Sequence, residues 1–235
     1  AMQIENDVQN LLNALGSYKD YILISSSAVY PETNEQPFRE SQPVGANSIW
    51  GAYGTNKIAA EKYLLKHNPR AYILRPPYLY GPMQNLYREP FMFDCAEANR
   101  KIYIPKDGKM KLQFFHVEDL CKVMEQILLT HPQQHIFNVG NEEITDINEF
   151  ANICCEAVGT KAEKVYVPAE YNQRDYFSFH DYSYTLDVSE MKKLLPIQKD
   201  LLEGLKESYA WYKEHREEVR KKPFFQYIDE NLTNL

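Results

Sequence analysis

The amino-acid sequence predicts an α/β fold, in which helices cover a parallel sheet. Apolar segments of strand length alternate with segments of helical length between residues 6 and 74. Strands that alternate with helices pair in parallel, because each helix carries the chain back to the same end of the sheet. A hydrophobic content of 44% and an aromatic content of 13% over 235 residues supply a packed core.

The first part of this pattern consists of two helix–strand pairs. Apolar residues recur at i, i+3, i+4 and i+7 in segment 6–15, which predicts an amphipathic helix. Strands are expected at 21–25 and 71–74, with a second helix at 53–67 between them. The polar, turn-rich segment 31–50 joins the first strand to that helix, and loops of this length in compact domains are usually functional or disordered.

Further elements are expected in the second part of the chain. Helices are predicted at 89–99, 117–129, 146–158 and 201 to about 220, and strands at 101–104, 135–139 and 164–167. Aromatic and polar residues alternate over 175–187, and we interpret this segment as a half-buried strand rather than a sugar-stacking wall. The charge-dense end of the last helix is expected to be a solvated face.

Charge, cysteine content and hydropathy exclude several classes of partner. A net charge of -7 disfavours nucleic acid, because non-specific affinity for phosphate comes from clustered lysine and arginine. The four cysteines include no CxxC and two are adjacent, a pattern that fits neither a metal site nor a disulfide framework. No apolar run reaches the ~18 residues of a membrane span. We therefore expect a cytoplasmic protein with no metal and no membrane partner.

Tyr53 and Lys57 carry the main chemical signal. They stand four residues apart in YGTNK, so that both lie on one face of the predicted helix. A free phenol, with a pKa near 10, is a poor base at neutral pH, but a neighbouring ammonium stabilises the phenolate. The spacing alone is weak, because Tyr209 and Lys213 share it in a helix that we expect to be structural.

A run of three serines strengthens this signal. Ser25, Ser26 and Ser27 follow the first strand, and ligands of parallel sheets bind outside the carboxyl ends of the strands. A serine there can hydrogen-bond a substrate hydroxyl or carbonyl while Tyr53 moves a proton. The alternative is that all three serines only cap the turn.

Four segments in order, ISSSAVYP, YGTNK, LRPPYLYGP and FFHVEDL, resemble the motifs of the extended short-chain dehydrogenase/reductase family of NAD-dependent nucleotide-sugar epimerases and dehydratases. The resemblance covers most of residues 6–200. It implies part of a Rossmann-type, doubly wound parallel sheet with a smaller C-terminal substrate-binding region. Residues 1–80 would form the C-terminal half of the NAD-binding domain. Residues 81–235 would form the substrate-binding region, with the helix near 117–129 packing back on the Rossmann part.

The resemblance also implies roles for individual residues. Ser26, Tyr53 and Lys57 would be catalytic, with Ser26 also contacting the substrate. Tyr53 and Lys57 would contact the cofactor, Lys57 through the nicotinamide ribose. Pro76 and Pro77 would line the nicotinamide. Under this interpretation Ser26 is the active-site hydroxyl, and its two neighbouring serines mainly satisfy backbone groups at the strand end.

Two departures from the family pattern concern the substrate. Tyr78 stands where many epimerases have an asparagine that contacts the nucleotide diphosphate, and Leu112 stands where they have an arginine. Ser27, Tyr78 and Arg88 are the further candidate substrate contacts, with Arg88 or Lys111 in place of the missing arginine. These departures leave the identity of the nucleotide sugar open.

A third departure concerns the cofactor, NAD or NADP. The family holds the cofactor pyrophosphate on a glycine-rich loop, and none of the nine glycines forms GxGxxG or GxxGxxG. We therefore expect that the pyrophosphate loop, with roughly the first third of the family fold, is absent from this chain. The chain is therefore expected to bind NAD weakly or not at all.

The predicted function is epimerisation or reduction of a nucleotide-sugar-like substrate by hydride transfer through a keto intermediate. A dehydratase is ranked lower, because Ala28 provides no acidic residue beside the serines. The alternative is a non-catalytic or RNA-associated relative, like the chloroplast stem-loop RNA-binding branch of the family. We expect a homo-oligomer, with the helix that carries Tyr53 and Lys57 as one dimer surface.

Overall fold

The computed structural model describes residues 4–235, which form two compact units. Unit 1 comprises the described residues up to 79 together with 113–142 and 184–198. Unit 2 comprises residues 80–112, 143–183 and 199–235. Within the described part of the chain, no helix is long and apolar enough to cross a membrane.

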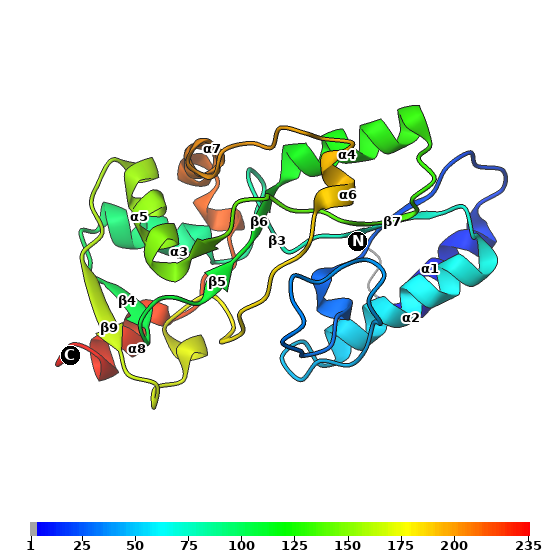
Figure 1. The fold of residues 1–235 in the computed structure, drawn as a ribbon. Coiled ribbons are helices and arrows are strands. Elements are labelled where there is room, and N and C mark those ends of the chain that lie inside the picture. The colour runs from blue at the N-terminus through cyan, green and yellow to red at the C-terminus, as the bar shows by residue number, and fades with distance from the viewer. Residues whose placement is uncertain (1–3) are drawn as a thin grey trace. The chain divides into compact units, whose positions relative to one another are not determined.

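Unit 1 is built on a three-stranded parallel sheet (Figure 1). Its strands are β1 (Ile22–Ile24), β2 (Tyr72–Arg75) and β7 (Ile136–Asn138), in the order β1-β2-β7. Leu23 pairs with Ile73, and Leu74 with Phe137. The parallel pairing confirms the predicted α/β class and brings the carboxyl ends of the three strands to one edge.

Helices lie on both sides of this sheet. The helices α1 (Glu5–Ala14) and α2 (Ala52–His67) lie together on one side, whereas α4 (Val117–Thr130) and α6 (Ser189–Lys192) lie on the other side of β7 (Figure 1). Unit 1 also contains the short 3-10 helix η1 (Ser27–Val29), directly after β1.

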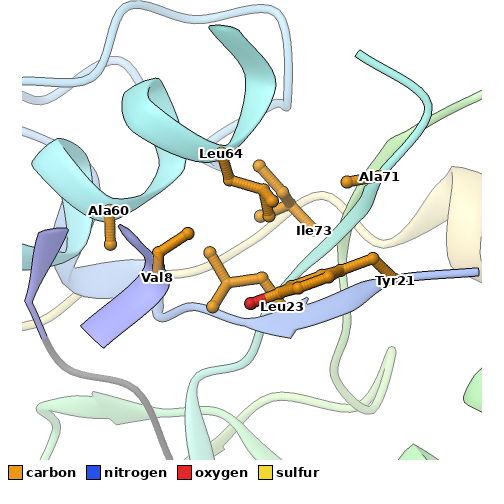
Figure 2. Packing of buried hydrophobic residues seen from close by; sticks show 7 residues of the cluster. All are labelled: Val8, Tyr21, Leu23, Ala60, Leu64, Ala71 and Ile73. Carbon is orange, nitrogen blue, oxygen red and sulfur yellow. The ribbon is translucent and has the colours of Figure 1, made fainter. Parts of the chain in front are cut away.

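Buried apolar side chains hold α1 and α2 on the sheet. Figure 2 shows Val8 of α1 and Leu64 of α2 directed toward Leu23 and Ile73 of the strands. All four side chains are at most 1% exposed. Full burial of side chains of this size contributes about 1.5–3 kcal/mol each, so this cluster fixes α2 against the sheet.

Unit 2 combines helices with two small sheets. Its helices are α3 (Glu89–Glu97), α5 (Ile147–Val158), α7 (Leu201–Glu214) and α8 (Phe224–Asn231), with the 3-10 turns η2 (Gln173–Asp175) and η3 (Arg216–Glu218). Its sheets pair β4 (Ile102–Pro105) with β9 (Lys164–Val167) in parallel, and β5 (Lys111–Leu112) with β8 (Thr145–Asp146) in antiparallel orientation. A further pair joins β3 (Tyr78–Tyr80) to β6 (Phe114–His116), and its residues belong to unit 1 except for Tyr80.

The predicted helices and strands are confirmed at most positions, within one to three residues at their ends, but the strand predicted over 175–187 is wrong. That segment is irregular apart from η2 and a single bridge from Leu186 to Phe38. Its aromatic rings pack on separate partners, such as Tyr227 for Tyr176 and Phe150 for Phe179. Residues 176–179 are all buried, so the alternation of residue types does not produce the alternating burial of a strand there.

The end predicted for the last helix, near residue 220, is also wrong. The helix α7 ends at Glu214, and a further helix, α8, follows. Arg216 and Lys221 do not form a purely solvated face, since both pair with the largely buried Asp94, at 3.4 and 2.9 Å. Tyr87 and Tyr212 also donate hydrogen bonds to Asp94, at 2.6 and 2.7 Å. Burial, together with the hydrogen bond from Tyr212 to Asp94, raises the pKa of Tyr212 to about 12.

The sheet of unit 1 leads to a prediction about assembly. Among the described residues β1 is an edge strand, and Leu11 and Leu15 of the neighbouring segment are 36% and 37% exposed. Unpaired edges and exposed apolar side chains favour association with a second chain. Light scattering at about tens of micromolar is expected to report a dimer or larger species. A mass near 27.6 kDa would contradict this expectation.

Candidate active site

The serine run lies at the carboxyl edge of the sheet. The N–H of Ser25 donates to the carbonyl of Leu74 at 2.7 Å, and the N–H of Ser27 donates to the carbonyl of Pro76 at 2.9 Å. The backbone pairing with the β2 side therefore continues beyond β1. It places the three serines beside the two prolines that follow β2.

The three serine hydroxyls have different partners from those expected. Ser25 donates to Glu61, and Ser27 donates to the hydroxyl of Tyr184 at 3.0 Å. Ser26 instead accepts the N–H of Ala28 at 3.2 Å and caps η1. The prediction that Ser25 and Ser27 satisfy backbone groups is wrong, because a buried carboxylate and a buried phenol lie within their reach. Ser26 is half-buried while the other two are buried, so its hydroxyl keeps access from outside.

A glycine allows α2 to approach this edge. A Cβ at Gly54 would overlap the backbone carbonyl oxygen of Ala28 in η1. Only a residue without a Cβ fits this distance of approach, so the spacing between α2 and the serine run depends on Gly54. Tyr53 and Lys57, on either side of Gly54 in sequence, are thereby held near the end of β1.

Tyr53 and Lys57 differ sharply in exposure. The Lys57 ammonium is buried, donates to the carbonyl of Ile24 at 3.0 Å and lies 5.9 Å from the centroid of the Tyr53 ring. Tyr53 is 43% exposed, so its phenol is accessible. Burial lowers the pKa of Lys57, while the carboxylates of Glu61 and Asp7 act in the opposite direction. A buried cation thus lies beside an accessible phenol.

The two prolines after β2 have different surroundings. Pro76 is buried, and its carbonyl accepts the hydrogen bond from Ser27. Pro77 is half-buried, and its ring faces Gly140, where an added Cβ would lie 3.3 Å from the proline Cγ. Pro77 is therefore the more accessible of the two candidate nicotinamide contacts.

Aromatic side chains gather next to the serines, and one of them was not expected. Tyr184 accepts the hydrogen bond from Ser27 and contacts the rings of Tyr78 and Trp50, with centroids 5.9 and 6.1 Å away. Tyr78 also contacts Phe114 at 6.0 Å. Two predicted substrate contacts, Ser27 and Tyr78, are thus joined by Tyr184. The alternating aromatic pattern around residue 184 was the only signal in the sequence for this role.

The other predicted substrate contact lies in unit 2. Arg88 precedes α3, and its Nε is 3.6 Å from a carboxylate oxygen of Glu89, which is 1% exposed. Burial raises the pKa of Glu89, and the Arg88 charge partly opposes this. Leu112 is buried in β5, while Lys111 is exposed. A role of Arg88 or Lys111 toward substrate stays a prediction.

The buried lysine and the accessible tyrosine lie near the carboxyl edge of a parallel sheet, where α/β proteins bind their ligands. The family model of the NAD dependent epimerase/dehydratase family matches residues 5–140. The chain belongs to this family, and the predicted resemblance is confirmed.

The similar proteins include one named for stem-loop binding and one named as an enzyme. The chloroplast stem-loop binding protein of 41 kDa b from Arabidopsis thaliana is 29% identical over 86% of this chain and 54% of its own length. The protein named probable GDP-L-fucose synthase 1 from rice (Oryza sativa subsp. japonica) is 27% identical over 91% of this chain and 68% of its own length. The chain therefore spans about half of the first relative and about two thirds of the second.

A solved structure shows the same fold. UDP-glucuronic acid 4-epimerase from Bacillus cereus, in complex with UDP-glucuronic acid and NAD, superposes with a TM-score of 0.69 and 19% identity. The match covers 89% of this chain and 67% of that chain. The Rossmann-type fold that the sequence predicts is thereby confirmed.

Gly54 provides a direct test of this geometry. In an ordinary helix, replacing glycine by alanine stabilises by about 1 kcal/mol. Here the added Cβ meets the Ala28 carbonyl, so Gly54→Ala is expected to destabilise by about 1–3 kcal/mol, as overpacking does. The free energy of unfolding in urea measures the effect.

The matched control is Asn56→Ala, at an exposed position of the same helix. It is expected to change the free energy of unfolding by no more than about 0.5 kcal/mol. If Gly54→Ala stabilised the protein, α2 would not depend on this close approach.

Proposed function

We propose that this chain carries the catalytic residues of an NAD(P)-dependent epimerase or reductase that acts on a nucleotide sugar. The observation that carries the proposal is the Lys57 ammonium, buried at the end of β1 and 5.9 Å from the accessible Tyr53 ring. Paired titratable groups in unequal surroundings are typical of acid–base sites. Family membership supports the class of reaction.

Each of the three catalytic side chains has a role that its surroundings support. Tyr53 takes the proton of a sugar hydroxyl as the attached C–H bond breaks, and returns it when a keto intermediate is reduced. Lys57 stabilises the phenolate through its charge. Ser26, the half-buried serine of the run, orients the sugar oxygen. NAD(P), when bound, supplies the acceptor and donor of the hydride.

Two of the described residues support binding of the nicotinamide half of the cofactor. Lys57, which donates to the Ile24 carbonyl, would also donate to the ribose, and the half-buried Pro77 would provide an apolar surface for the ring. No GxGxxG or GxxGxxG occurs in the chain, so its own glycines form no pyrophosphate loop of that kind. The chain is therefore proposed to hold NAD(P) mainly through the nicotinamide side.

A sugar ring is the proposed substrate group, because an aromatic side chain lies near the serines. Trp50 is half-buried and packs on Tyr184, whose hydroxyl accepts the hydrogen bond from Ser27, whereas Tyr78 and Tyr184 are themselves buried. An aromatic face beside hydroxyl groups suits a sugar, which combines C–H faces with polar edges. Ala28 provides no acid beside the serines, so epimerisation or reduction is proposed before dehydration.

A non-catalytic, RNA-associated role is the alternative. It draws on the 29% identity to a chloroplast stem-loop binding protein. The net charge of -7 opposes it, because counterion release from phosphates requires clustered cations. Binding of RNA by the chain, together with no turnover of any nucleotide sugar, would favour the alternative.

The test replaces Tyr53 by phenylalanine in the full-length protein. Only the hydroxyl is lost, so the fold is expected to persist. Turnover of the best substrate among UDP-, dTDP- and GDP-sugars is expected to fall by about 10²–10⁴, the usual contribution of general acid–base catalysis.

Tyr209→Phe is the matched control. Tyr209 and Lys213 share the four-residue spacing, yet the Tyr209 hydroxyl donates to Glu97 at 2.8 Å in unit 2. This variant is expected to keep turnover within about twofold of the unchanged protein. Retention of more than about a tenth of the activity in Tyr53→Phe would refute the assignment of Tyr53.

A further inference from the structure

A buried ion pair lies directly behind the catalytic residues. The Arg75 guanidinium donates to both carboxylate oxygens of Glu61, from Nε at 3.1 Å and from Nη2 at 2.7 Å. Each side chain is 4% exposed. The hydroxyl of Ser25 donates to the same carboxylate. Glu61 is therefore held by three donors in one orientation.

Glu61 lies on the same face of α2 as Lys57. The two residues are four apart in α2, so they lie on the same helix face. Lys57 reaches the carbonyl of Ile24, and Glu61 receives the hydroxyl of the next residue, Ser25. Both side chains thus meet the end of β1 at consecutive residues, immediately before Ser26.

The ion pair extends into a chain of hydrogen bonds along the sheet edge. Arg75 Nη1 donates to the hydroxyl of Tyr30 at 3.0 Å, and that hydroxyl donates to Asn138 Oδ1 at 2.7 Å. Ser25, Arg75 and Asn138 stand at the carboxyl ends of β1, β2 and β7. The network therefore joins all three strand ends beneath the candidate site.

Stability alone does not explain a buried pair here. Removing two charges from water costs about as much as their attraction returns, and apolar replacements of such pairs are often neutral or stabilising. The carboxylate does, however, act on the buried Lys57 ammonium. Burial lowers the pKa of Lys57, and the charges that oppose this are Glu61 on α2 and Asp7 on α1. Tyr53 is a further titratable group that faces it.

We propose that Glu61 is a positioning residue of this site. Fixed by Arg75 and Ser25, its carboxylate keeps the Lys57 ammonium charged and directed to the end of β1, next to Tyr53. The inference rests on the proposed function for its catalytic meaning, because it assigns to Glu61 the control of the charge that Tyr53 requires. The charge of Lys57 itself can be measured without any turnover.

The experiment follows the ¹³Cε resonance of Lys57 during a pH titration of the 235-residue chain labelled with ¹³C-lysine. Loss of one signal in Lys57→Met assigns the resonance. In Glu61→Gln the titration midpoint of Lys57 is expected to shift to lower pH, because a neutral amide no longer stabilises the ammonium. The exposed Lys62 and Lys66 of the same helix serve as internal controls and are expected not to shift.

A second variant covers the case in which Glu61→Gln does not fold, since it leaves a buried arginine without its partner. Glu61→Gln combined with Arg75→Met removes both charges, and circular dichroism and thermal unfolding report whether the fold persists. The Lys57 midpoint is expected to fall in this double variant too.

An unchanged Lys57 midpoint in a folded variant would overturn the inference and leave the proposed function untouched. Conversely, a lowered midpoint together with full activity of Tyr53→Phe would refute the proposed function and leave the control of Lys57 by Glu61 intact. The two ideas therefore fail on different measurements.

Discussion

The docking of α2 against the end of β1 is the contact on which the rest of the site depends. Three residues of α2 contact the last residue of that strand and two residues that follow it. Lys57 binds the carbonyl of Ile24, Glu61 binds the hydroxyl of Ser25, and Gly54 lies against the carbonyl of Ala28. The apolar cluster around Leu64 supplies the free energy that holds the helix there, and the polar contacts set its register.

The charged side chains at the carboxyl edge of the sheet need partners because they are buried. A lysine in an apolar interior loses its charge unless an acid stands near it, and an acid in the same interior requires donors of its own. Here Glu61 acts toward Lys57, and Arg75 and Ser25 act toward Glu61. Lys57 thus has one acid on its own helix and a second one, Asp7, on α1, and Glu61 has its donors on β2 and directly after β1. Tyr53, in contrast, keeps its phenol exposed.

Local signals in the sequence were sufficient for most helices and for the parallel sheet, because their apolar periodicities match the faces that become buried. They also predicted that Tyr53 and Lys57 lie on one face of a helix, because residues four apart in a helix share a face. They failed for Tyr184, whose role depends on a contact with Ser27, 157 residues earlier in the chain. No local pattern encodes a pairing over such a separation.

The same reason explains two other errors. α7 ends at Glu214 where the sequence still favours a helix, and the following Lys221 pairs with Asp94, 127 residues away. The hydroxyl of Ser25 turns to Glu61, a partner supplied by the next helix rather than by the local backbone. In both cases contacts with residues distant in sequence outweigh the local conformational or hydrogen-bonding preference.

The central claim is that the carboxyl edge of β1 and β2 holds the nicotinamide half of NAD(P). A titration of the ¹⁵N-labelled chain with nicotinamide mononucleotide, followed by NMR, tests it most directly. The account predicts saturable shifts at the amides of Ser26, Tyr53 and Lys57, with little change in unit 2. Saturable shifts confined to other residues, or none at any concentration up to about tens of millimolar, would contradict it.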